Sequence, residues 1–373
     1  MDGQPKPNIL ITRLSHIGDC LLTLPMVNAI KDQCPQARIT WAVESPTQKL
    51  LALHPSVDEI LMIPKGWAGK PRCWISLRRQ LQQPQFDIAI DPQGITKSAG
   101  LGWLSGAKQR IGIRGRWGRE LSTWLNNKLV ETEATHIVPR SIELIQGMGL
   151  SVNANPPRFD LPVCPESQQQ VVRWLDEVAT DQDFDPQKII VINPGGTWAS
   201  KRWEMDRFGA VANYLKSHHD LTSVVVWAGD EEHQMATDIK RHADALGPSN
   251  ACVVACPTSL RELAALSALG QFFIGGDTGP LHLANAVGTP CIGLYGTTRP
   301  EDSCAFGDQH IAIQAWYQDG SCRQRRNATN DAMRDISIEA VQQASDQMVS
   351  QIANSKLPKF DAVASKQQIL QAG

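Results

Sequence analysis

The sequence predicts an α/β protein made of two doubly wound parallel sheets. Short apolar runs alternate with amphipathic stretches along nearly the whole chain, which is the pattern of a parallel sheet covered by helices. The alternation starts again near residue 188, after a proline-rich stretch. The 373 residues are too many for one ordinary core and suit two domains.

In the first half, apolar runs predict strands over residues 8–14, 38–43 and 86–91. Amphipathic or apolar stretches between and after them predict helices over residues 21–34, 98–105 and 136–147. In the second half, strands are predicted over residues 188–193, 222–228, 271–275 and 291–295. Helices are expected to begin near residues 206, 230, 259 and 279.

The halves are joined by a segment that contains five prolines and one predicted helix, over residues 168–179. We therefore expect an N-terminal domain over residues 1–155, a crossover over 156–187 and a C-terminal domain over 188–335. A helix over 336–355 could return to the N-terminal domain, and a polar tail would follow over 356–373.

Composition indicates an ordinary soluble globular protein, with 42% apolar and 20% charged residues. No apolar run reaches the roughly 18 residues of a membrane span, and the polar N-terminus lacks the pattern of a signal peptide. The nine cysteines are scattered without a CxxC pair. We therefore expect a cytoplasmic protein with no metal site.

The first candidate site is the turn after the first strand, where Gly18 and Asp19 precede a helix. Doubly wound sheets bind ligands beyond the carboxyl ends of their strands, and a helix N-terminus favours an ionised acid. Asp19 is thus a candidate acid–base residue, or alternatively only a helix cap. The GxGxxG fingerprint of a dinucleotide site is missing here.

The second candidate is the loop from Asn193 to Trp203, which carries two glycines, hydroxyls and the cations Lys201 and Arg202. Glycines let backbone N–H groups approach a phosphate, and lysine supplies a compact positive charge. The spacing does not match a Walker A loop, so an ATPase is disfavoured. The alternative is a solvated turn with exposed cations.

The third candidate runs from Gly275 to Ala286, where two glycines end a strand and Asp-Thr-Gly opens a helix. Free N–H groups and the helix dipole make such a helix start an anion site that needs no metal. Pro280 sits where a first turn tolerates proline. His282 could bind a ligand or serve as a structural hydrogen-bonding residue.

A basic stretch is the fourth candidate, because residues 60–119 hold eleven Lys and Arg against only Asp87 and Asp91. Four tryptophans are interleaved with these cations: Trp67, Trp74, Trp103 and Trp117. A positive face of this kind suits an anionic glycan, with tryptophans stacking on sugar rings. No nucleic-acid-binding motif accompanies it, so we expect no nucleic-acid partner. A merely solvated face is the alternative.

The ordered motifs HIGDCLLTLP, DPQG, INPGGTWASKRW, GDTGPLHLANAVGTP and YGTTRPE resemble glycosyltransferase family 9. The best-known members of this family are the ADP-heptose:lipopolysaccharide heptosyltransferases, and the likeness extends from about residue 8 to residue 352. Glu204 departs from the proline that is common after KRW, and the C-terminal cysteine cluster of the family is reduced to Cys322.

The resemblance implies a GT-B fold, in which two Rossmann-like domains face a central cleft and the N-terminal one binds the acceptor. It implies that Asp19 is the general base and that Lys201 contacts the donor diphosphate, so these are the catalytic candidates. The expected donor-binding residues are Gly195, Gly196, Thr197, Lys201, Glu232, Gly276, Asp277, Thr278, Gly279, Pro280 and His282. The expected acceptor-binding residues are Arg13, His16, Arg78, Arg79, Arg114 and Arg116.

The expected activity is an inverting, metal-independent transfer of heptose from ADP-heptose to an anionic lipopolysaccharide core-type glycan. It would need no cofactor and could bring the protein into peripheral contact with the inner membrane surface. One alternative is a nucleotide-sugar epimerase, which pairs two similar domains but needs no acceptor face. Another is a non-catalytic nucleotide- or glycan-binding protein, which would leave Asp19 without a role.

Overall fold

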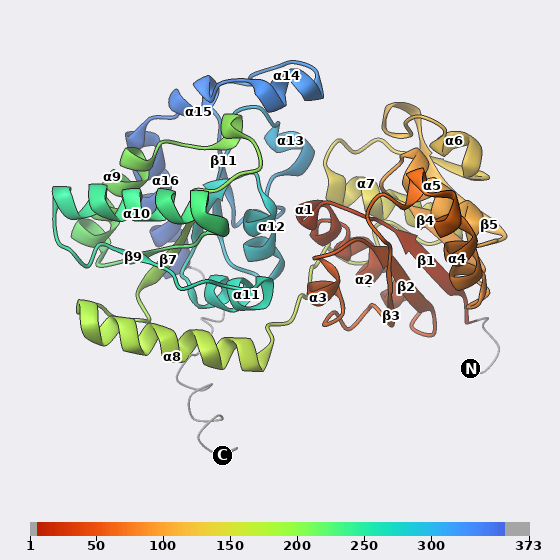
Figure 1. The fold of residues 1–373 in the computed structure, drawn as a ribbon, viewed down its shortest axis with the longest axis horizontal. Coiled ribbons are helices and arrows are strands. Elements are labelled where there is room, and N and C mark those ends of the chain that lie inside the picture. Colours follow the sequence, from red (N-terminus) through yellow and green to blue (C-terminus); the bar gives the residue numbers. More distant parts are fainter. Residues whose placement is uncertain (1–5, 355–373) are drawn as a thin grey trace, which may run out of the picture. The chain divides into compact units, whose positions relative to one another are not determined.

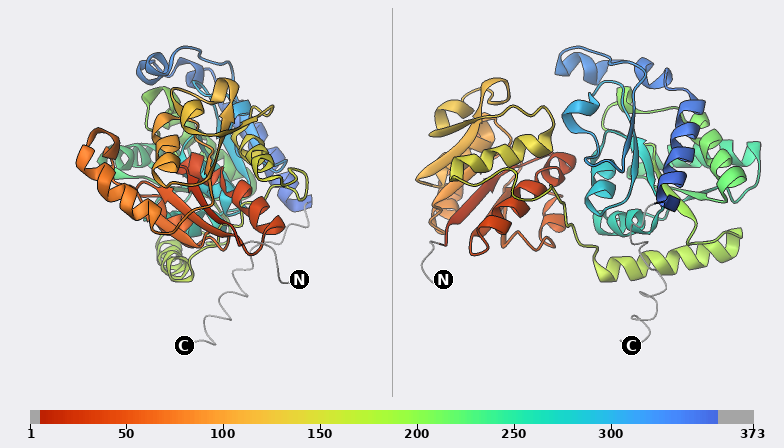
Figure 2. Two further views of the ribbon diagram at one scale, coloured as in Figure 1. Left: turned by 90° about the vertical axis from the view of Figure 1, so that its right-hand side faces the viewer. Right: turned by 180° about the vertical axis from the view of Figure 1, so that it is seen from behind.

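The computed structural model describes residues 6–354, which form two α/β units, shown in Figures 1 and 2. The chain divides between Pro162 and Val163, and each unit carries one six-stranded parallel sheet. The predicted fold class is therefore confirmed. The tail predicted over residues 356–373 lies outside the described residues.

The sheet of the first unit has the strand order β3-β2-β1-β4-β5-β6. Its strands are β1 (Asn8–Thr12), β2 (Arg38–Val43), β3 (Glu59–Met62), β4 (Ile88–Asp91), β5 (Gln109–Arg114) and β6 (Lys128–Glu131). The predicted strands correspond to β1, β2 and β4, which are mostly buried. The strands β3, β5 and β6 were not predicted, because they are partly exposed and charged residues at their ends leave only short apolar runs.

The helices of the first unit are α1 (Ile17–Leu21), α2 (Leu24–Gln33), α3 (Gln48–Leu51), α4 (Pro71–Gln82), α5 (Thr96–Leu104), α6 (Ser122–Leu125) and α7 (Ile137–Glu143). Three 3₁₀ turns accompany them: η1 (Trp67–Gly69), η2 (Gly115–Trp117) and η3 (Leu144–Met148). The helix predicted over 21–34 corresponds to α2, which begins at Leu24 with Pro25 in its first turn, where proline favours a helix start. The short helix α1 before it was not predicted. The helices α4 and α5 pack on one face of the sheet, where Leu77 and Leu101 join a buried cluster.

The sheet of the second unit has the order β12-β11-β10-β7-β8-β9. Its strands are β7 (Ile189–Asn193), β8 (Thr222–Val225), β9 (Cys252–Val254), β10 (Phe273–Gly276), β11 (Cys291–Leu294) and β12 (Ile311–Ile313). Four of them were predicted, whereas β9 and β12 have only three residues each and were not.

The helices of the second unit are α8 (Pro165–Gln182), α9 (Met205–His219), α10 (Gly229–Leu246), α11 (Leu260–Leu269), α12 (Gly279–Ala286), α13 (Pro300–Ser303), α14 (Cys322–Asn327), α15 (Asp331–Arg334) and α16 (Ile338–Asn354). The 3₁₀ turn η4 (Ala199–Lys201) precedes α9. The helix predicted within the crossover is α8, which is longer than expected and packs against α11 of the second unit.

The helix predicted over residues 336–355 is α16, and it belongs to the second unit. Val341 and Met348 are fully buried in the core of that unit together with Trp203. In addition, Tyr214 of α9 donates a hydrogen bond to the carboxylate of Asp346. The apolar face of α16 is thus covered by the second sheet and α9.

Candidate functional site

Two of the predicted loops lie side by side in the second unit because the strands that precede them are neighbours. The strands β7 and β10 pair in parallel, with Asn193 opposite Gly275. The Asn193 side-chain amide donates to Thr278 Oγ1 at 3.2 Å and to the Gly195 carbonyl at 3.3 Å. Asn193 therefore ties the loop after β7 to the start of α12, a role that the sequence did not reveal.

A buried ionic network lies where these two loops meet. Lys201 Nζ donates to both the carbonyl oxygen and the carboxylate of Asp277, each at 2.9 Å. His282 Nε2 lies 3.1 Å from the other carboxylate oxygen of Asp277. Burial acts to raise the pKa of Asp277, but the charge of Lys201 and the hydrogen bond of His282 outweigh it and hold this pKa below its usual range. Asp277 is therefore ionised and compensates much of the charge of Lys201.

The N-terminus of α12 supplies the backbone donors of the candidate site. Thr278 is the N-cap residue, in extended conformation, and Gly279 and Pro280 open the first turn. Proline has no N–H group, so the donors at this end are those of Gly279 and Leu281, which lie too early in the helix to have an intrahelical acceptor. His282 is 5% exposed and hydrogen-bonded to Asp277, which favours a positioning role for it over direct ligand contact.

Glu232 extends the site to a third loop. It lies in the first turn of α10, which follows β8, and Oε2 accepts the Ala228 N–H at 2.9 Å. A Cβ atom on Gly195 would lie only 2.2 Å from Glu232 Oε1, so the Glu232 carboxylate packs directly against the Gly195 backbone. Any side chain at position 195 would displace Glu232. Thr197, in the same loop as Gly195, is exposed.

Arg202 and Trp198 also lie in the loop after β7. Arg202 forms an ion pair with Glu231 and donates to the Gly196 carbonyl at 3.0 Å. Two cations lie near the Trp198 ring: its centroid is 4.9 Å from Lys201 Nζ and 5.2 Å from the guanidinium carbon of Arg326. Sequence reasoning missed Trp198 and Arg326, although three arginines within the six residues of α14 were a visible signal.

In the first unit, Asp19 lies within α1 rather than in a turn before the helix. The N-cap residue of α1 is His16, whose side chain is 84% exposed and lies 3.8 Å from the carboxylate of Asp19. Arg13 Nη2 lies 3.1 Å from that carboxylate. Since the side chain of Arg13 is only 6% exposed, Arg13 is a buried partner of Asp19, and its contact with the acceptor stays a prediction.

The turn after β4 supports this ion pair. The Pro92 carbonyl accepts a hydrogen bond from Arg13 Nη1 at 2.7 Å, and Gln93 Oε1 accepts the Leu14 N–H at 2.9 Å. The turn itself is held by Asp91, whose carboxylate accepts the N–H groups of Gln93 and Gly94. Burial raises the pKa of Asp91 to about 6, against the opposing effect of its hydrogen bonds.

The predicted basic residues of the first unit are divided between two places. Arg78 and Arg79 are exposed on α4, whereas Arg114 ends β5 and Arg116 lies in η2. The guanidinium of Arg116 lies 4.7 Å from the centroid of the Trp117 ring.

The tryptophans of the basic stretch differ in exposure. Trp67 is 2% exposed within the core, which corrects the expectation that it could stack on a ligand. Trp74 and Trp103 are exposed, and further apolar side chains are exposed on the same helices or beside them, namely Ile75, Leu121 and Trp124.

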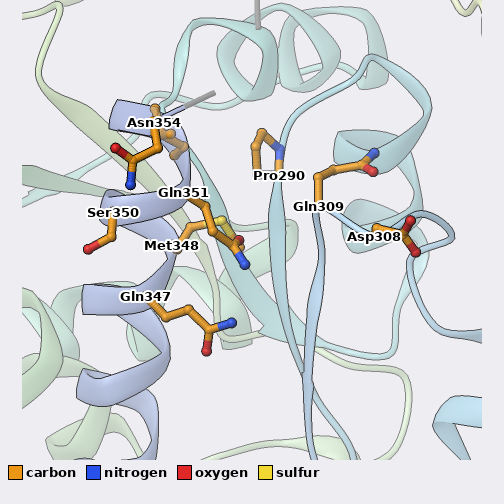
Figure 3. Close-up of a pocket in the computed structure, with 9 residues that line it drawn as sticks. Pro290, Asp308, Gln309, Gln347, Met348, Ser350, Gln351 and Asn354 are labelled. Atoms are coloured by element: carbon orange, nitrogen blue, oxygen red, sulfur yellow. The ribbon is translucent and has the colours of Figure 1, made fainter. Parts of the chain in front are cut away.

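A cavity of about 500 Å³ in the second unit lies apart from the candidate site. Figure 3 shows that its lining comes from α16 and from the segments that hold Pro290 and Asp308. These two residues precede β11 and β12, so the cavity adjoins the amino ends of the strands. The loops after β7, β8 and β10 lie at the opposite, carboxyl edge of the sheet.

Residues 6–354 contain neither a metal-binding cluster nor a membrane-spanning helix. No group of three or more His, Cys, Asp and Glu side chains is arranged to hold a metal ion. Within the same range, no helix has both the length and the apolar character required to cross a membrane.

Comparison with solved structures shows the type of fold. The Escherichia coli heptosyltransferase WaaC with ADP superposes with a TM-score of 0.69 at 22% identity, covering 93% of this chain and 99% of that one. A family 9 glycosyltransferase from Veillonella parvula gives 0.78 at 20% identity, covering 94% and 99%. The fold is therefore that of GT-B glycosyltransferases.

The sequence comparisons are more specific. The profile of glycosyltransferase family 9 (heptosyltransferase) matches residues 74–333, and this chain belongs to that family. The lipopolysaccharide core heptosyltransferase OpsX of Haemophilus influenzae is 27% identical over 318 residues, covering 84% of this chain and 85% of the relative. Lipopolysaccharide heptosyltransferase 1 of Pseudomonas aeruginosa is 25% identical with the same coverage. Family membership makes the protein a glycosyltransferase and disfavours the epimerase and the non-catalytic alternatives.

Proposed function

We propose that this enzyme transfers heptose from ADP-heptose to an anionic glycan of the lipopolysaccharide core type, with inversion at the anomeric carbon. The observation that carries the donor part is the convergence of three loops at one edge of the second sheet. They bring together Lys201, the N-terminus of α12 and Glu232. The names of the relatives support heptose and the lipopolysaccharide core, and the WaaC structure with ADP supports the nucleotide.

In this proposal, the donor diphosphate lies against the first turn of α12, where the helix dipole and free N–H groups favour negative charge. Gly279 and Leu281 present these N–H groups beside the N-cap residue Thr278, and Lys201 contributes its charge as the diphosphate departs. Gly276 allows close packing here, since a Cβ atom on it would lie 2.7 Å from the Lys201 carbonyl. Glu232 would accept hydrogen bonds from the ribose hydroxyls.

The same arrangement supports a metal-independent reaction, in which fixed dipoles and Lys201 take the place of a divalent cation. The matching experiment is an assay in EDTA. The transfer rate should stay unchanged there, and a strict requirement for Mg²⁺ or Mn²⁺ would contradict the metal-independent mechanism.

For the chemical step, we propose that Asp19 removes the proton of the acceptor hydroxyl. The hydroxyl oxygen then forms a bond to the anomeric carbon while the bond from that carbon to the diphosphate oxygen breaks, and ADP leaves. A single displacement of this kind inverts the configuration. Arg13 holds the carboxylate in place and, as a neighbouring cation, favours its ionised form.

We assign the acceptor and the membrane surface to the first unit. Arg78, Arg79, Arg114 and Arg116 are exposed there and would attract an anionic glycan. The exposed side chains of Ile75, Leu121 and Trp124, with neighbouring cations, suit a peripheral contact with anionic lipid headgroups. We therefore expect the enzyme to work at the cytoplasmic face of the inner membrane.

The experiment that tests the proposed function is the variant Asp19→Asn. The amide oxygen of asparagine can still accept from Arg13, so the fold and ADP affinity should be retained while the general base is lost. The kcat should fall about 10²- to 10⁴-fold, the usual worth of general-base catalysis. Asp87→Asn, which alters an exposed carboxylate at the other end of β4, is the matched control and should keep normal kcat.

Two further measurements accompany this test. The anomeric configuration of the product, determined by NMR, reports inversion or retention. A thermal-shift comparison of ADP, UDP and GDP reports the donor nucleotide, because a ligand at 100 times its Kd stabilises the folded state by about 2.7 kcal/mol. A near-normal kcat in Asp19→Asn would contradict the assignment of Asp19 as the general base. Stronger stabilisation by UDP than by ADP would contradict ADP-heptose as the donor.

A further inference from the structure

The loop after β7 carries two cations, and both are compensated by carboxylates. Lys201 is paired with Asp277 at 2.9 Å, and Arg202 is paired with Glu231. Two such pairs add little net charge to the site. A departing nucleoside diphosphate carries more than one negative charge, and its stabilisation depends on positive groups already in place. A further cation beside this loop would therefore add to the stabilisation that Lys201 and the N-terminus of α12 give to the diphosphate.

Arg326 of α14 is a cation that lies close to the loop after β7. Its guanidinium lies over the Trp198 ring, and the same ring is within 4.9 Å of Lys201 Nζ. Within residues 6–354, no carboxylate forms an ion pair with Arg326. Arg326 is exposed, so its charge is available to a ligand that approaches Lys201.

The position of α14 beside this loop is set by buried contacts. Ser200, which is fully buried, donates from Oγ to the Arg325 carbonyl at 2.7 Å. Arg325 Nη1 donates to the Thr297 carbonyl in the loop after β11 at 3.0 Å. Both bonds are made by Arg325, so they anchor α14 at the residue next to Arg326. Figure 1 shows α14 at the same end of the second unit as α13 and α15.

We propose that Arg326, Trp198 and Lys201 together form the binding site for the diphosphate of the nucleotide donor, with Arg326 contacting phosphate oxygens directly. A guanidinium over an indole ring is attracted to the face of that ring, and its planar fork of N–H groups can still bind two phosphate oxygens. Trp198 thus orients Arg326, and Lys201 Nζ lies near the same ring. This inference rests on the proposed function, since it extends the same donor site.

The test is calorimetry of ADP and adenosine binding to the full chain, with the variants Arg326→Gln and Arg323→Gln. Arg323 is exposed on the same short helix and is the matched control for a lost surface charge. A charge-assisted hydrogen bond is worth roughly 1.5–3 kcal/mol, so Arg326→Gln should weaken ADP binding about 10- to 150-fold. Adenosine affinity should not change in this variant, and Arg323→Gln should bind both ligands normally.

Several outcomes would overturn the inference. One is ADP affinity of Arg326→Gln within twofold of wild type, and another is an equal loss in Arg323→Gln, which would indicate only long-range charge. If Lys201→Ala loses ADP affinity while Arg326→Gln does not, the proposed donor site stands and the inference about Arg326 fails. If the wild-type enzyme prefers another nucleoside diphosphate, the proposed donor fails, and the same comparison with that nucleotide still decides the role of Arg326.

Discussion

The buried carboxyl of Asp91 makes the stability of the first unit depend on pH. Asp91 is 2% exposed at the end of β4, and burial raises its pKa from 3.8 to about 6. The unfolded chain therefore releases this proton at lower pH than the folded protein does. At low pH both states hold the proton, and the contribution of Asp91 to stability is fully present. As pH rises from about 4 through about 6, that contribution is lost.

The magnitude follows from the two pKa values. Each pKa unit corresponds to about 1.4 kcal/mol, so the full loss is about 3 kcal/mol. About half of it has occurred by pH 5, and about 1 kcal/mol is lost between pH 5 and pH 7. Asp91→Asn abolishes the titration, while its amide oxygen can still accept the N–H groups of Gln93 and Gly94. The free energy of unfolding of Asp91→Asn, minus that of wild type, should thus rise by about 1 kcal/mol over this range.

The assay is urea unfolding of the full chain at several pH values between about 5 and 8. Saturating ADP should stabilise only the unit that binds it, which identifies the transition of the first unit. A difference in the free energy of unfolding between Asp91→Asn and wild type that is the same at every pH reflects altered packing. Only the change of this difference with pH reports the titration of Asp91. Asp87→Asn is the control, since Asp87 is exposed at the other end of β4 and its variant should run parallel to wild type. Parallel pH dependences of wild type and Asp91→Asn would refute the reasoning.

Three further predictions concern the proposed sites. Lys201→Ala should weaken ADP binding about 10- to 150-fold by calorimetry, the worth of a charge-assisted hydrogen bond, and unchanged affinity would remove Lys201 from the donor site. Replacing Arg78 and Arg79 by Gln should raise the acceptor KM and reduce its dependence on ionic strength, with ADP affinity unchanged; equal acceptor KM in wild type and variant would argue for a solvated face. Trp124→Ser should reduce co-sedimentation with vesicles containing phosphatidylglycerol, because Trp124 is 86% exposed in the first unit. Trp316→Ser, at a 42% exposed tryptophan of the second unit, is its control, and equal binding by both variants would exclude this contact.

Local patterns determined the elements that carry the site. The buried parallel strand β7 is an uninterrupted apolar run, which identifies it without reference to the rest of the fold. The start of α12 is marked by glycines and by a proline in its first turn, so Gly279 was placed at the helix start from the sequence. Edge strands such as β6 escaped detection because half-exposed residues dilute the apolar pattern.

The sequence by itself determined the two α/β halves, the loops that bear the candidate residues and the family. Only the tertiary structure decided which charges meet. Lys201 and Asp277 are 76 residues apart in the chain, yet they form one buried pair. Likewise, Arg326 meets Trp198 only because α14 is anchored beside the loop after β7. An ion pair or a cation–π contact depends on distance in space, which spacing along the chain encodes only within a single helix or turn.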